Sequence, residues 1–238
     1  HGVLSYARLG ETRVAQAGHE KLRSYFHRIR ISGERLLLLV NDLLDLSKFE
    51  AGRMVLNMGP VRLDALVQEV IHEFDALLHS RRLRVELEQE PGVPDISGDA
   101  ARIGQVVRNL LSNAAKFTPE GRSIHIRLAT AVLPEGQDGA DQADAPAVLL
   151  SISDEGVGIP PEELDAVFDK FVQSSRTRTG AGGTGLGLAI CLELVDAHRG
   201  RITARNNAAG GAEFMVVLPL GKVQERLFPA LTAQGESL

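Results

Sequence analysis

Two amides and an ammonium group recur at helical spacing in the middle of the chain. Asn109, Asn113 and Lys116 follow Gln105 at intervals of 4, 4 and 3 residues, which places all four on one face of a helix. Carboxamide oxygens are hard ligands that suit Mg²⁺, and a lysine one turn further can meet a phosphate. The spacing indicates a metal and phosphate site, and a solvated polar face is the alternative.

A carboxylate followed by two glycines comes directly after the apolar segment 148–152. Asp154 is followed by Gly156, Gly158 and Ile159. Glycines let the backbone approach a flat ligand closely, and an aspartate can accept a hydrogen bond from an exocyclic amine. The segment indicates one end of a ligand pocket, and a simple acidic turn is the alternative.

A glycine-rich run from Gly180 to Gly187 leads straight into the apolar helical segment 186–198. Its exposed N–H groups and the helix N-terminus favour phosphates. The run has no parallel β-α-β unit around it and lacks the Gly-Lys-Ser/Thr of a P-loop. It indicates a phosphate-binding loop, with a flexible linker as the alternative. Arg176 and Arg178 could assist the phosphates or be solvated.

Residues 1–52 are predicted to form a helical hairpin. An apolar stripe over 3–9 and a polar break at 10–18 precede a long helix that stops near Gly52. Residues 36–40 are apolar nearly all round, so burial on more than one side is expected. A hairpin this thin should dimerise as a four-helix bundle.

After Gly52 the pattern mixes strands and helices. Strands are predicted at 54–58, 83–87, 123–131, 147–153, 201–205 and 213–218, and helices at 63–78, 100–116, 162–168 and 186–198. Asp99 is the expected N-cap of the helix at 100–116. Residues 134–146 are expected to be a mobile hairpin loop. The fold class is α+β, an α/β sandwich with helices on one face of a mixed, largely antiparallel sheet.

Composition narrows the class of protein. The net charge of −5 gives no global basic bias, so no nucleic-acid partner is expected. The single cysteine, Cys191, excludes an internal disulfide and is expected to fill the core. No apolar run is long enough for a membrane span. The chain starts without methionine inside an apolar pattern, so we expect it to be a fragment.

The order of these segments resembles the catalytic and ATP-binding domain of two-component sensor histidine kinases, within the GHKL superfamily. The matching segments are Asp99 to Pro119 (N box), Asp154 to Gly158 (G1 box), Phe168 to Phe171 (F box), Gly183 to Leu188 (G2 box), a looser match at Gly210 to Phe214, and the junction Asp45 to Gly52. The resemblance covers roughly residues 1–220.

This resemblance implies a Bergerat-type ATP-binding fold in three parts. They are a dimerisation and phosphotransfer hairpin at 1–52, a catalytic domain at 53–220, and a tail or linker at 221–238. The implied cofactors are ATP and Mg²⁺, and the implied partners are a second copy through residues 1–52 and a response-regulator receiver domain. A cytoplasmic location follows, with any membrane anchor in segments of the parent protein.

The resemblance also implies roles for individual residues. Asn113 is the principal Mg²⁺ ligand with Asn109 near the same ion, Lys116 reaches the phosphates, and Asn109 and Lys116 are the catalytic residues. The implied nucleotide-binding residues are Asn113, Lys116, Phe117, Asp154, Gly156, Gly158, Ile159, Gly183, Thr184, Gly185, Leu186 and Gly187. The implied lid residues are Phe168, Phe171, Arg176, Arg178, Gly180 and Gly182.

The family phosphorylates a histidine on the first hairpin helix, but neither His1 nor His19 has the expected surroundings. We therefore expect the acceptor to precede residue 1, so that the chain binds Mg-ATP without autophosphorylating. Two alternatives remain open. One is a GHKL-type ATPase, in which a glutamate usually stands where this chain has Asn109. The other is a signalling module with a vestigial nucleotide site.

Overall fold

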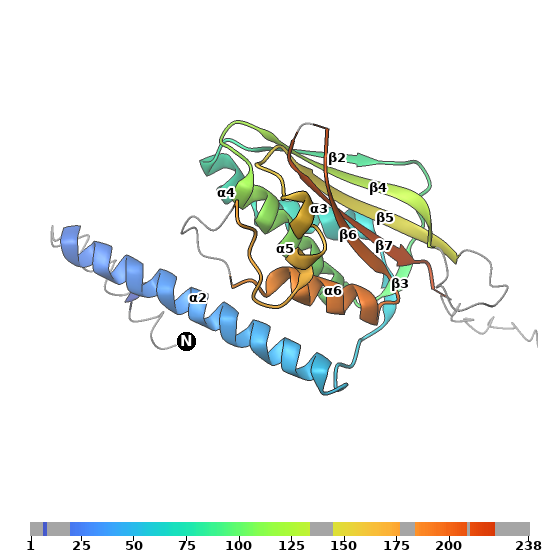
Figure 1. Cartoon of the computed structure of the whole chain (residues 1–238), viewed down its shortest axis with the longest axis horizontal. Coiled ribbons are helices and arrows are strands. Elements are labelled where there is room, and N and C mark those ends of the chain that lie inside the picture. Colours follow the sequence, from blue (N-terminus) through green and yellow to red (C-terminus); the bar gives the residue numbers. More distant parts are fainter. Residues whose placement is uncertain (1–6, 9–19, 134–144, 177–183, 209, 222–238) are drawn as a thin grey trace, which may run out of the picture.

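The computed structural model describes residues 7–8, 20–133, 145–176, 184–208 and 210–221. A long helix, α2 (Glu20–Glu50), lies along one side of a domain built from a sheet and its covering helices (Figure 1). The predicted first hairpin helix, the loop at 134–146 and the C-terminal tail fall almost entirely outside the described residues. No helix in the described ranges is long and apolar enough to cross a membrane.

Helix α2 ends near Gly52, as the sequence predicts. Gly52 has a φ of 62°, and its N–H donates to the carbonyl of Phe49 at 2.9 Å. The next N–H, from Arg53, donates to Lys48 at 2.9 Å. These bonds satisfy carbonyls that have no partner inside the helix, and only glycine adopts this backbone conformation without strain.

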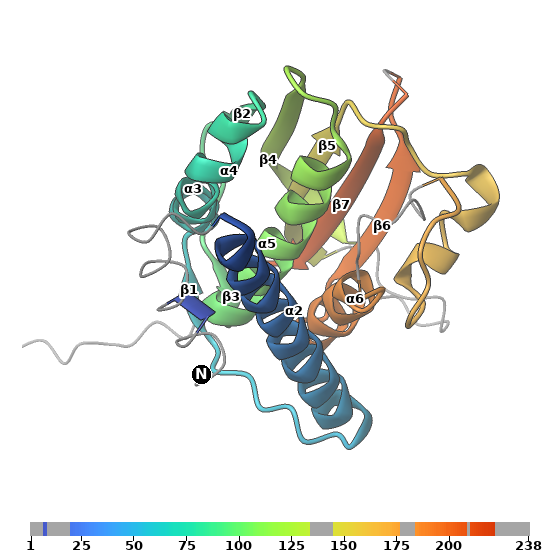
Figure 2. The same ribbon diagram turned by 90° about the vertical axis from the view of Figure 1, so that its left-hand side faces the viewer.

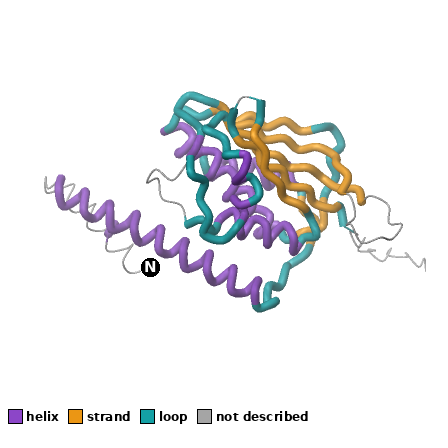
Figure 3. Tube along the Cα trace, viewed as in Figure 1, coloured by secondary structure: helices purple, strands orange, loops and turns teal. Residues whose placement is uncertain are grey.

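The sheet has five strands in the order β2-β4-β5-β7-β6. Their bounds are β2 Arg84–Gln89, β4 Ser123–Leu133, β5 Ala145–Asp154, β6 Arg201–Asn206 and β7 Ala212–Pro219. Only the β2–β4 pair is parallel, and the other three pairs are antiparallel. Figure 3 shows the strands as one layer and the helices as another. The predicted mixed, largely antiparallel sheet is confirmed.

Three helices cover one face of the sheet: α3 (Leu63–Glu73), α5 (Ala100–Phe117) and α6 (Gly187–Ala197). Figure 2 shows α5 and α6 between the sheet and α2. Val107, Leu110, Leu111 and Ala114 of α5 are 3% exposed or less, and their spacing of three and four residues defines the buried stripe. The polar stripe of the same helix therefore faces away from the sheet.

Some predicted boundaries were wrong. Residues 54–58 form no strand, and Val55 is 86% exposed. The alternating apolar pattern there has no neighbouring strand to pair with. The strand in this region is instead β1 (Gly59–Val61), which pairs antiparallel with β3 (Ile96–Gly98), a strand that the sequence did not predict. Pairing partners distant in sequence decide such short strands.

Two predicted helices are also interrupted. The helix expected at 63–78 stops at Phe74, whose N–H bonds to Ile71 at 3.0 Å in a tighter turn, and α4 (Asp75–Ser80) follows. The segment 162–168 forms two 3₁₀ turns, η1 (Pro161–Glu163) and η2 (Ala166–Phe168). Short 3₁₀ turns are common as connectors and give no clear helical periodicity.

A buried carboxylate joins three parts of the domain. Asp99, 8% exposed, caps α5 through Oδ1, which accepts from the N–H groups of Ala101 and Arg102. Its Oδ2 accepts from the N–H of Asn57 at 2.9 Å, in the segment that follows α2. Its own N–H donates to Nε2 of His198 at 3.0 Å, at the end of α6. The predicted N-cap is confirmed, with two further connections.

These contacts set the charge of Asp99. Burial raises the pKa of this carboxyl, but hydrogen bonds from the N–H groups of Asn57, Arg102 and Ala101 outweigh the burial and hold the pKa below its ordinary value. Because the folded-state pKa is depressed, this stabilisation is present above the unfolded pKa. It is lost as pH falls through the folded value.

Replacing this carboxylate tests the junction. We expect Asp99→Ala to lower the free energy of unfolding by about 2 kcal/mol or more, because it removes the cap and leaves buried N–H groups unsatisfied. Urea unfolding at pH 7 measures the change. Exposed Asp95→Ala is the control, with an expected change within about 0.5 kcal/mol. Equal midpoints for the two variants would contradict the assigned role.

Candidate functional site

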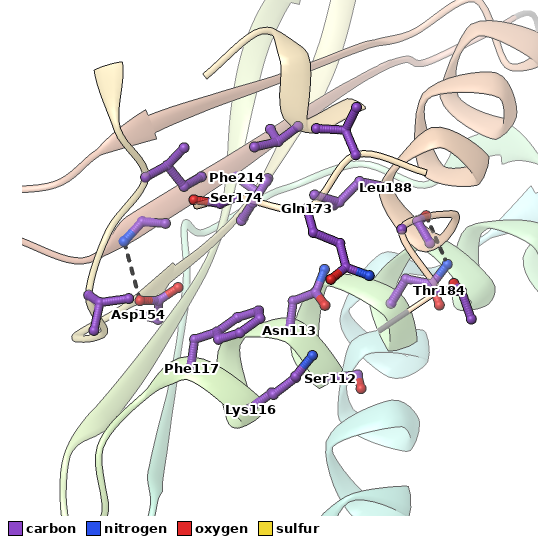
Figure 4. A pocket seen from close by; sticks show the side chains of 18 of the residues that line it. Ser112, Asn113, Lys116, Phe117, Asp154, Gln173, Ser174, Thr184, Leu188 and Phe214 are labelled. Carbon is purple, nitrogen blue, oxygen red and sulfur yellow. Dashed lines mark hydrogen bonds between the residues drawn. The ribbon is translucent and has the colours of Figure 1, made fainter. Parts of the chain in front are cut away.

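A cavity of about 410 Å³ lies at the edge of the helical layer, bounded by α5, the start of α6, the end of β5 and α2. Ten of the predicted site residues line it: Asn109, Asn113, Lys116, Phe117, Asp154, Gly158, Ile159, Thr184, Gly185 and Gly187. Figure 4 shows Asp154 at one end and Thr184 at the other, with Asn113, Lys116 and Phe117 between them. The fold thus brings three separate sequence segments to one cavity.

At the first end, Asp154 stands at the last position of β5 and is 5% exposed. Its Oδ1 accepts from the N–H of Gly156 at 2.8 Å and from the N–H of Ala212 at 3.2 Å. Burial raises the pKa of Asp154, and these two hydrogen bonds only partly oppose the shift. Both bonds end on Oδ1, so Oδ2 is the oxygen that can accept from a ligand.

The glycines beside Asp154 are required by close contacts. A Cβ on Gly156 would lie 2.6 Å from Oδ1 of Asp154 and 2.8 Å from the carbonyl oxygen of Phe117. Gly158 has a φ of 67°, and a Cβ there would lie 2.5 Å from the carbonyl oxygen of Gly210. Any side chain would therefore displace the backbone that shapes this end of the cavity.

Two asparagines that are not among the predicted site residues hold this loop in place. Asn206 bonds Ile159 twice, accepting from its N–H at 2.8 Å and donating to its carbonyl at 2.7 Å. Asn207 donates to the carbonyl of Asp154 at 2.7 Å and accepts from the N–H of Gly211 at 3.0 Å. The sequence feature that could have predicted this role is the pair of asparagines directly after the predicted strand 201–205.

Asn109, Asn113 and Lys116 of α5 form the central wall, as their spacing predicts. The amide nitrogen of Asn109 donates to the carbonyl of Gly187 at 3.2 Å, which turns its oxygen toward other donors or a cation. The ammonium of Lys116 lies 4.7 Å from the centre of the Phe117 ring, a cation–π distance.

These side chains suit Mg²⁺, which prefers oxygen ligands and usually keeps several waters. Within the described residues, no group of three or more His, Cys, Asp or Glu side chains could hold a metal by itself. Two amide oxygens alone make an incomplete shell. An ion here would therefore be shared with oxygens of a bound ligand, as is usual for Mg²⁺ at phosphates.

The start of α6 forms the far end of the cavity. The N–H of Leu186 donates to Oγ1 of Thr184 at 3.1 Å, and Leu186 itself is fully buried. Gly185 has a φ of 71°, and a Cβ there would lie within 2.8 Å of the backbone of Phe171. The backbone N–H groups before this 11-residue helix favour an anion.

The predicted lid residues divide into different environments. Phe168 belongs to the core and packs edge-to-face on Phe214, with ring centroids 6.2 Å apart. The Phe171 ring is 63% exposed, but its N–H donates to the carbonyl of Gly185 at 2.9 Å. Arg176 donates to the carbonyl of Val157 at 3.0 Å. Val157 is part of the loop that follows Asp154.

The remaining predicted lid positions, Arg178, Gly180 and Gly182, lie outside the described residues, as does Gly183, which is predicted to bind the nucleotide. Cys191, predicted to fill the core, is fully buried behind α5. Burial raises the pKa of its thiol to about 12, so the reactive thiolate form is scarce at neutral pH.

Helix α2 supplies a wall of the cavity that the sequence did not predict. Leu38, Leu39 and Asp42 line it, although α2 belongs to the predicted hairpin. Oδ2 of Asp42 accepts from the hydroxyl of Thr184 at 3.3 Å. This contact joins positions 142 residues apart, and no local pattern predicts it.

Ion pairs hold α2 against the domain. Oδ2 of Asp45 accepts from Arg102 at 3.0 Å and from the amide of Gln105 at 3.1 Å. Near the end of the helix, Lys170 donates to Glu50 at 2.6 Å. Gln105 therefore binds α2 and does not line the cavity, although it shares a helix face with Asn109.

A helix-covered mixed sheet, with an amide-bearing helix and a glycine-rich helix start around one cavity, defines a GHKL-type nucleotide-binding domain. The chain belongs to the family of histidine kinase-, DNA gyrase B- and HSP90-like ATPases, whose model matches residues 98–222. The model of the His Kinase A (phospho-acceptor) domain matches residues 1–52. The predicted class, a sensor histidine kinase with a dimerisation region and a GHKL domain, is confirmed.

The chain is similar to parts of larger signalling proteins. It is 37% identical over 203 residues to the circadian input-output histidine kinase CikA of Synechococcus elongatus, an alignment that covers 84% of this chain and 25% of that protein. It is 34% identical over 186 residues to the alginate biosynthesis sensor protein KinB of Pseudomonas aeruginosa, covering 78% and 29% respectively. The chain therefore spans about a quarter of the length of these relatives.

Solved structures support the same fold. Full-length ShkA in complex with AMPPNP matches with a TM-score of 0.69 and 30% identity, over 92% of this chain and 42% of that one. Histidine kinase ThkA in complex with the response regulator protein TrrA matches with a TM-score of 0.64 and 27% identity, over 85% and 52%. The predicted α+β fold class is confirmed.

The contacts of Gly156 lead to a test. We expect Gly156→Ala to destabilise the domain by about 1–3 kcal/mol, because the new Cβ forces the carboxylate of Asp154 and the backbone of Phe117 apart. Thermal or urea unfolding measures this. Gly59→Ala is the matched control, since a Cβ there meets nothing within 4 Å. Equal stability of the two variants would show that the packing at Gly156 is looser than described.

Proposed function

We propose that this chain is the catalytic core of a sensor histidine kinase. It binds Mg-ATP and transfers the γ-phosphoryl group to a histidine, for relay to an aspartate of a response regulator. The proposal rests on the arrangement of one cavity, which has the buried carboxylate of Asp154 at one end and Asn109, Asn113 and Lys116 toward the other. Such a cavity suits a ligand with a hydrogen-bond donor at one end and negative charge at the other.

Asp154 would identify the adenine ring. Its Oδ2 accepts from the exocyclic amine, while Oδ1 stays bound to two backbone N–H groups. The backbone of Gly156, Gly158 and Ile159 shapes the pocket for a flat ring, and Phe117 flanks it. Because the carboxylate is buried, an unmade hydrogen bond there is costly, and this favours a base that donates at that position.

The phosphates would lie between α5 and the start of α6. Asn113 would be the principal Mg²⁺ ligand, with Asn109 near the same ion or its water, and Mg²⁺ held there would supply charge neutralisation at the phosphates. Lys116 reaches the phosphates. Thr184, Gly185 and Gly187 surround them at the helix N-terminus, with Gly183 and Leu186 completing the segment.

The proposed lid residues are Phe168, Phe171, Arg176, Arg178, Gly180 and Gly182, of which the last three lie outside the described residues. Phe168 and Phe171 would anchor the lid. Arg178 assists the phosphates, while Arg176 braces the adenine loop through Val157. The bond from the N–H of Phe171 to the carbonyl of Gly185 would join this anchor to the phosphate-binding segment.

Phosphoryl transfer is favoured over hydrolysis. GHKL-type ATPases usually carry a glutamate that activates water one turn before the metal-binding asparagine. Here that position is Asn109, whose amide nitrogen is bound to the carbonyl of Gly187. A neutral amide is a poor general base, whereas an incoming imidazole nitrogen needs no base to become nucleophilic.

The domains and partners are part of the same proposal. Residues 1–52 form the dimerisation hairpin, 53–220 the catalytic domain and 221–238 a tail or linker. Leu36, Leu43 and Leu44 of α2 are 45–62% exposed, which supports a homodimeric helix bundle, as does the phospho-acceptor domain match. A response-regulator receiver domain is the expected partner, and the location is cytoplasmic, with any membrane anchor in other segments of the parent protein.

None of the seven histidines in these residues is the proposed phosphoacceptor. His198, for example, is 6% exposed, with Nδ1 bound to the carbonyl of Leu194 at 2.7 Å and Nε2 bound to the N–H of Asp99. We expect this polypeptide to gain no phosphate that is labile in acid and stable in base when incubated with γ-labelled Mg-ATP. Acid and base treatment of the labelled protein measures this, and such a phosphate would contradict the proposal.

Nucleotide titration with an Asp154→Asn variant tests the proposed function. The asparagine oxygen can keep the two backbone bonds of Oδ1, which turns its NH₂ toward the adenine amine. We expect Mg-ATP affinity to fall by about tenfold to hundredfold, and Mg-GTP, whose O6 accepts, to lose less. Calorimetry measures both affinities, with Asp95→Asn as the control. If the wild-type chain shows no affinity for Mg-ATP, the proposed function is wrong.

A further inference from the structure

Asp42 places a carboxylate at the phosphate end of the cavity. It is half-buried and lines the same cavity as Asn109, Asn113, Lys116 and Thr184. Its Oδ2 accepts from the hydroxyl of Thr184 at 3.3 Å. The hydroxyl proposed to face the phosphates is therefore bound to a negative side chain from α2.

The charge of Asp42 is not neutralised by the domain. Asp45, one turn further along α2, lies 3.0 Å from the guanidinium of Arg102. In the part of the chain that the structure describes, no ion pair includes Asp42, and its hydrogen-bond partner is the uncharged hydroxyl of Thr184. Burial raises the pKa of Asp42, the bond from Thr184 opposes this rise, and the charge of Asp45 adds to it.

The contacts of α2 keep this carboxylate at the cavity. The pairs of Asp45 with Arg102 and of Glu50 with Lys170 flank the end of the helix. Leu38 and Leu39, one turn before Asp42, line the cavity as well. Asp42 is therefore held on the face of α2 that is turned toward the site.

A triphosphate without a metal would bring several negative charges to this position. Like charges a few ångströms apart at a partly buried site repel strongly enough to change affinity by about tenfold or more. A divalent cation reverses the effect, because its own charge attracts the carboxylate and its waters can donate to it. Asp42 therefore weakens the binding of the metal-free triphosphate and tolerates or assists the binding of the metal-bound triphosphate.

We propose that Asp42 of α2 is a specificity-determining residue that makes the nucleotide site selective for metal-bound ATP over metal-free ATP. The inference rests on the proposed function, since it assumes that phosphates occupy the end of the cavity near Thr184. It adds to that function a residue from outside the nucleotide-binding domain. The dimerisation helix then takes part in deciding which form of the nucleotide enters.

Calorimetric titration of the whole 238-residue chain tests this inference. ATP is titrated once with excess Mg²⁺ and once with EDTA. The measured quantity is the dissociation constant with EDTA divided by the dissociation constant with Mg²⁺. We expect Asp42→Asn to reduce this ratio about tenfold, mainly through tighter binding of metal-free ATP. Asp42→Glu, which keeps the charge, should keep a ratio near that of the wild type. Adenosine, which has no phosphate, should bind all of these variants equally.

Glu34→Gln is the matched control. It removes one negative charge from the same helix, two turns before Asp42 and outside the cavity lining, where Glu34 is paired with Arg30 at 3.0 Å. Its ratio should equal that of the wild type. Asp42→Ser is a second neutral variant, and circular dichroism confirms that each variant is folded.

The possible results distinguish a wrong inference about Asp42 from a wrong proposed function. If the wild type binds Mg-ATP and the neutral Asp42 variants keep its ratio, the inference is wrong and the proposed function stands. If Glu34→Gln lowers the ratio as much as Asp42→Asn, general charge on α2 is the cause and the inference is again wrong. If the wild type binds ATP in neither condition, the proposed function fails as well.

Discussion

The buried carboxylate of Asp99 is the constraint on which the site depends. It caps α5, accepts from Asn57 in the segment after α2, and its backbone N–H bonds to His198 at the end of α6. These bonds fix the two helices that form the cavity walls relative to each other. They add to the packing of the buried faces of α5 and α6 in the common core, which brings the amides of α5 and the N-terminus of α6 to the same cavity.

The two ends of the cavity differ in chemistry, and this difference would orient a nucleotide. Asp154 is buried and satisfied on one oxygen, so it offers a single acceptor at a defined position. Toward the other end, the amides of Asn109 and Asn113, the ammonium of Lys116 and the N-terminus of α6 favour a cation and phosphates. A ligand with these two features reversed would leave a buried acceptor unpaired.

Helix α2 belongs to the predicted dimerisation hairpin, but one of its faces contacts the nucleotide-binding domain. Its outer leucines remain exposed, in keeping with a helix bundle, whereas Asp42 and Asp45 contact the nucleotide-binding domain through Thr184 and Arg102. A change in the proposed bundle that shifted α2 would therefore shift the carboxylate of Asp42 at the cavity.

The sequence by itself determined the features that depend on local spacing. Asn109, Asn113 and Lys116 share a face because a helix repeats every 3.6 residues, and Asp154 ends a strand that its apolar pattern predicts. Tertiary structure alone decided the features that join distant segments: the β1–β3 pair, the bonds of Asn206 to Ile159, and Asp42 at Thr184. Local patterns record which face a residue occupies, but not which distant residue that face will meet.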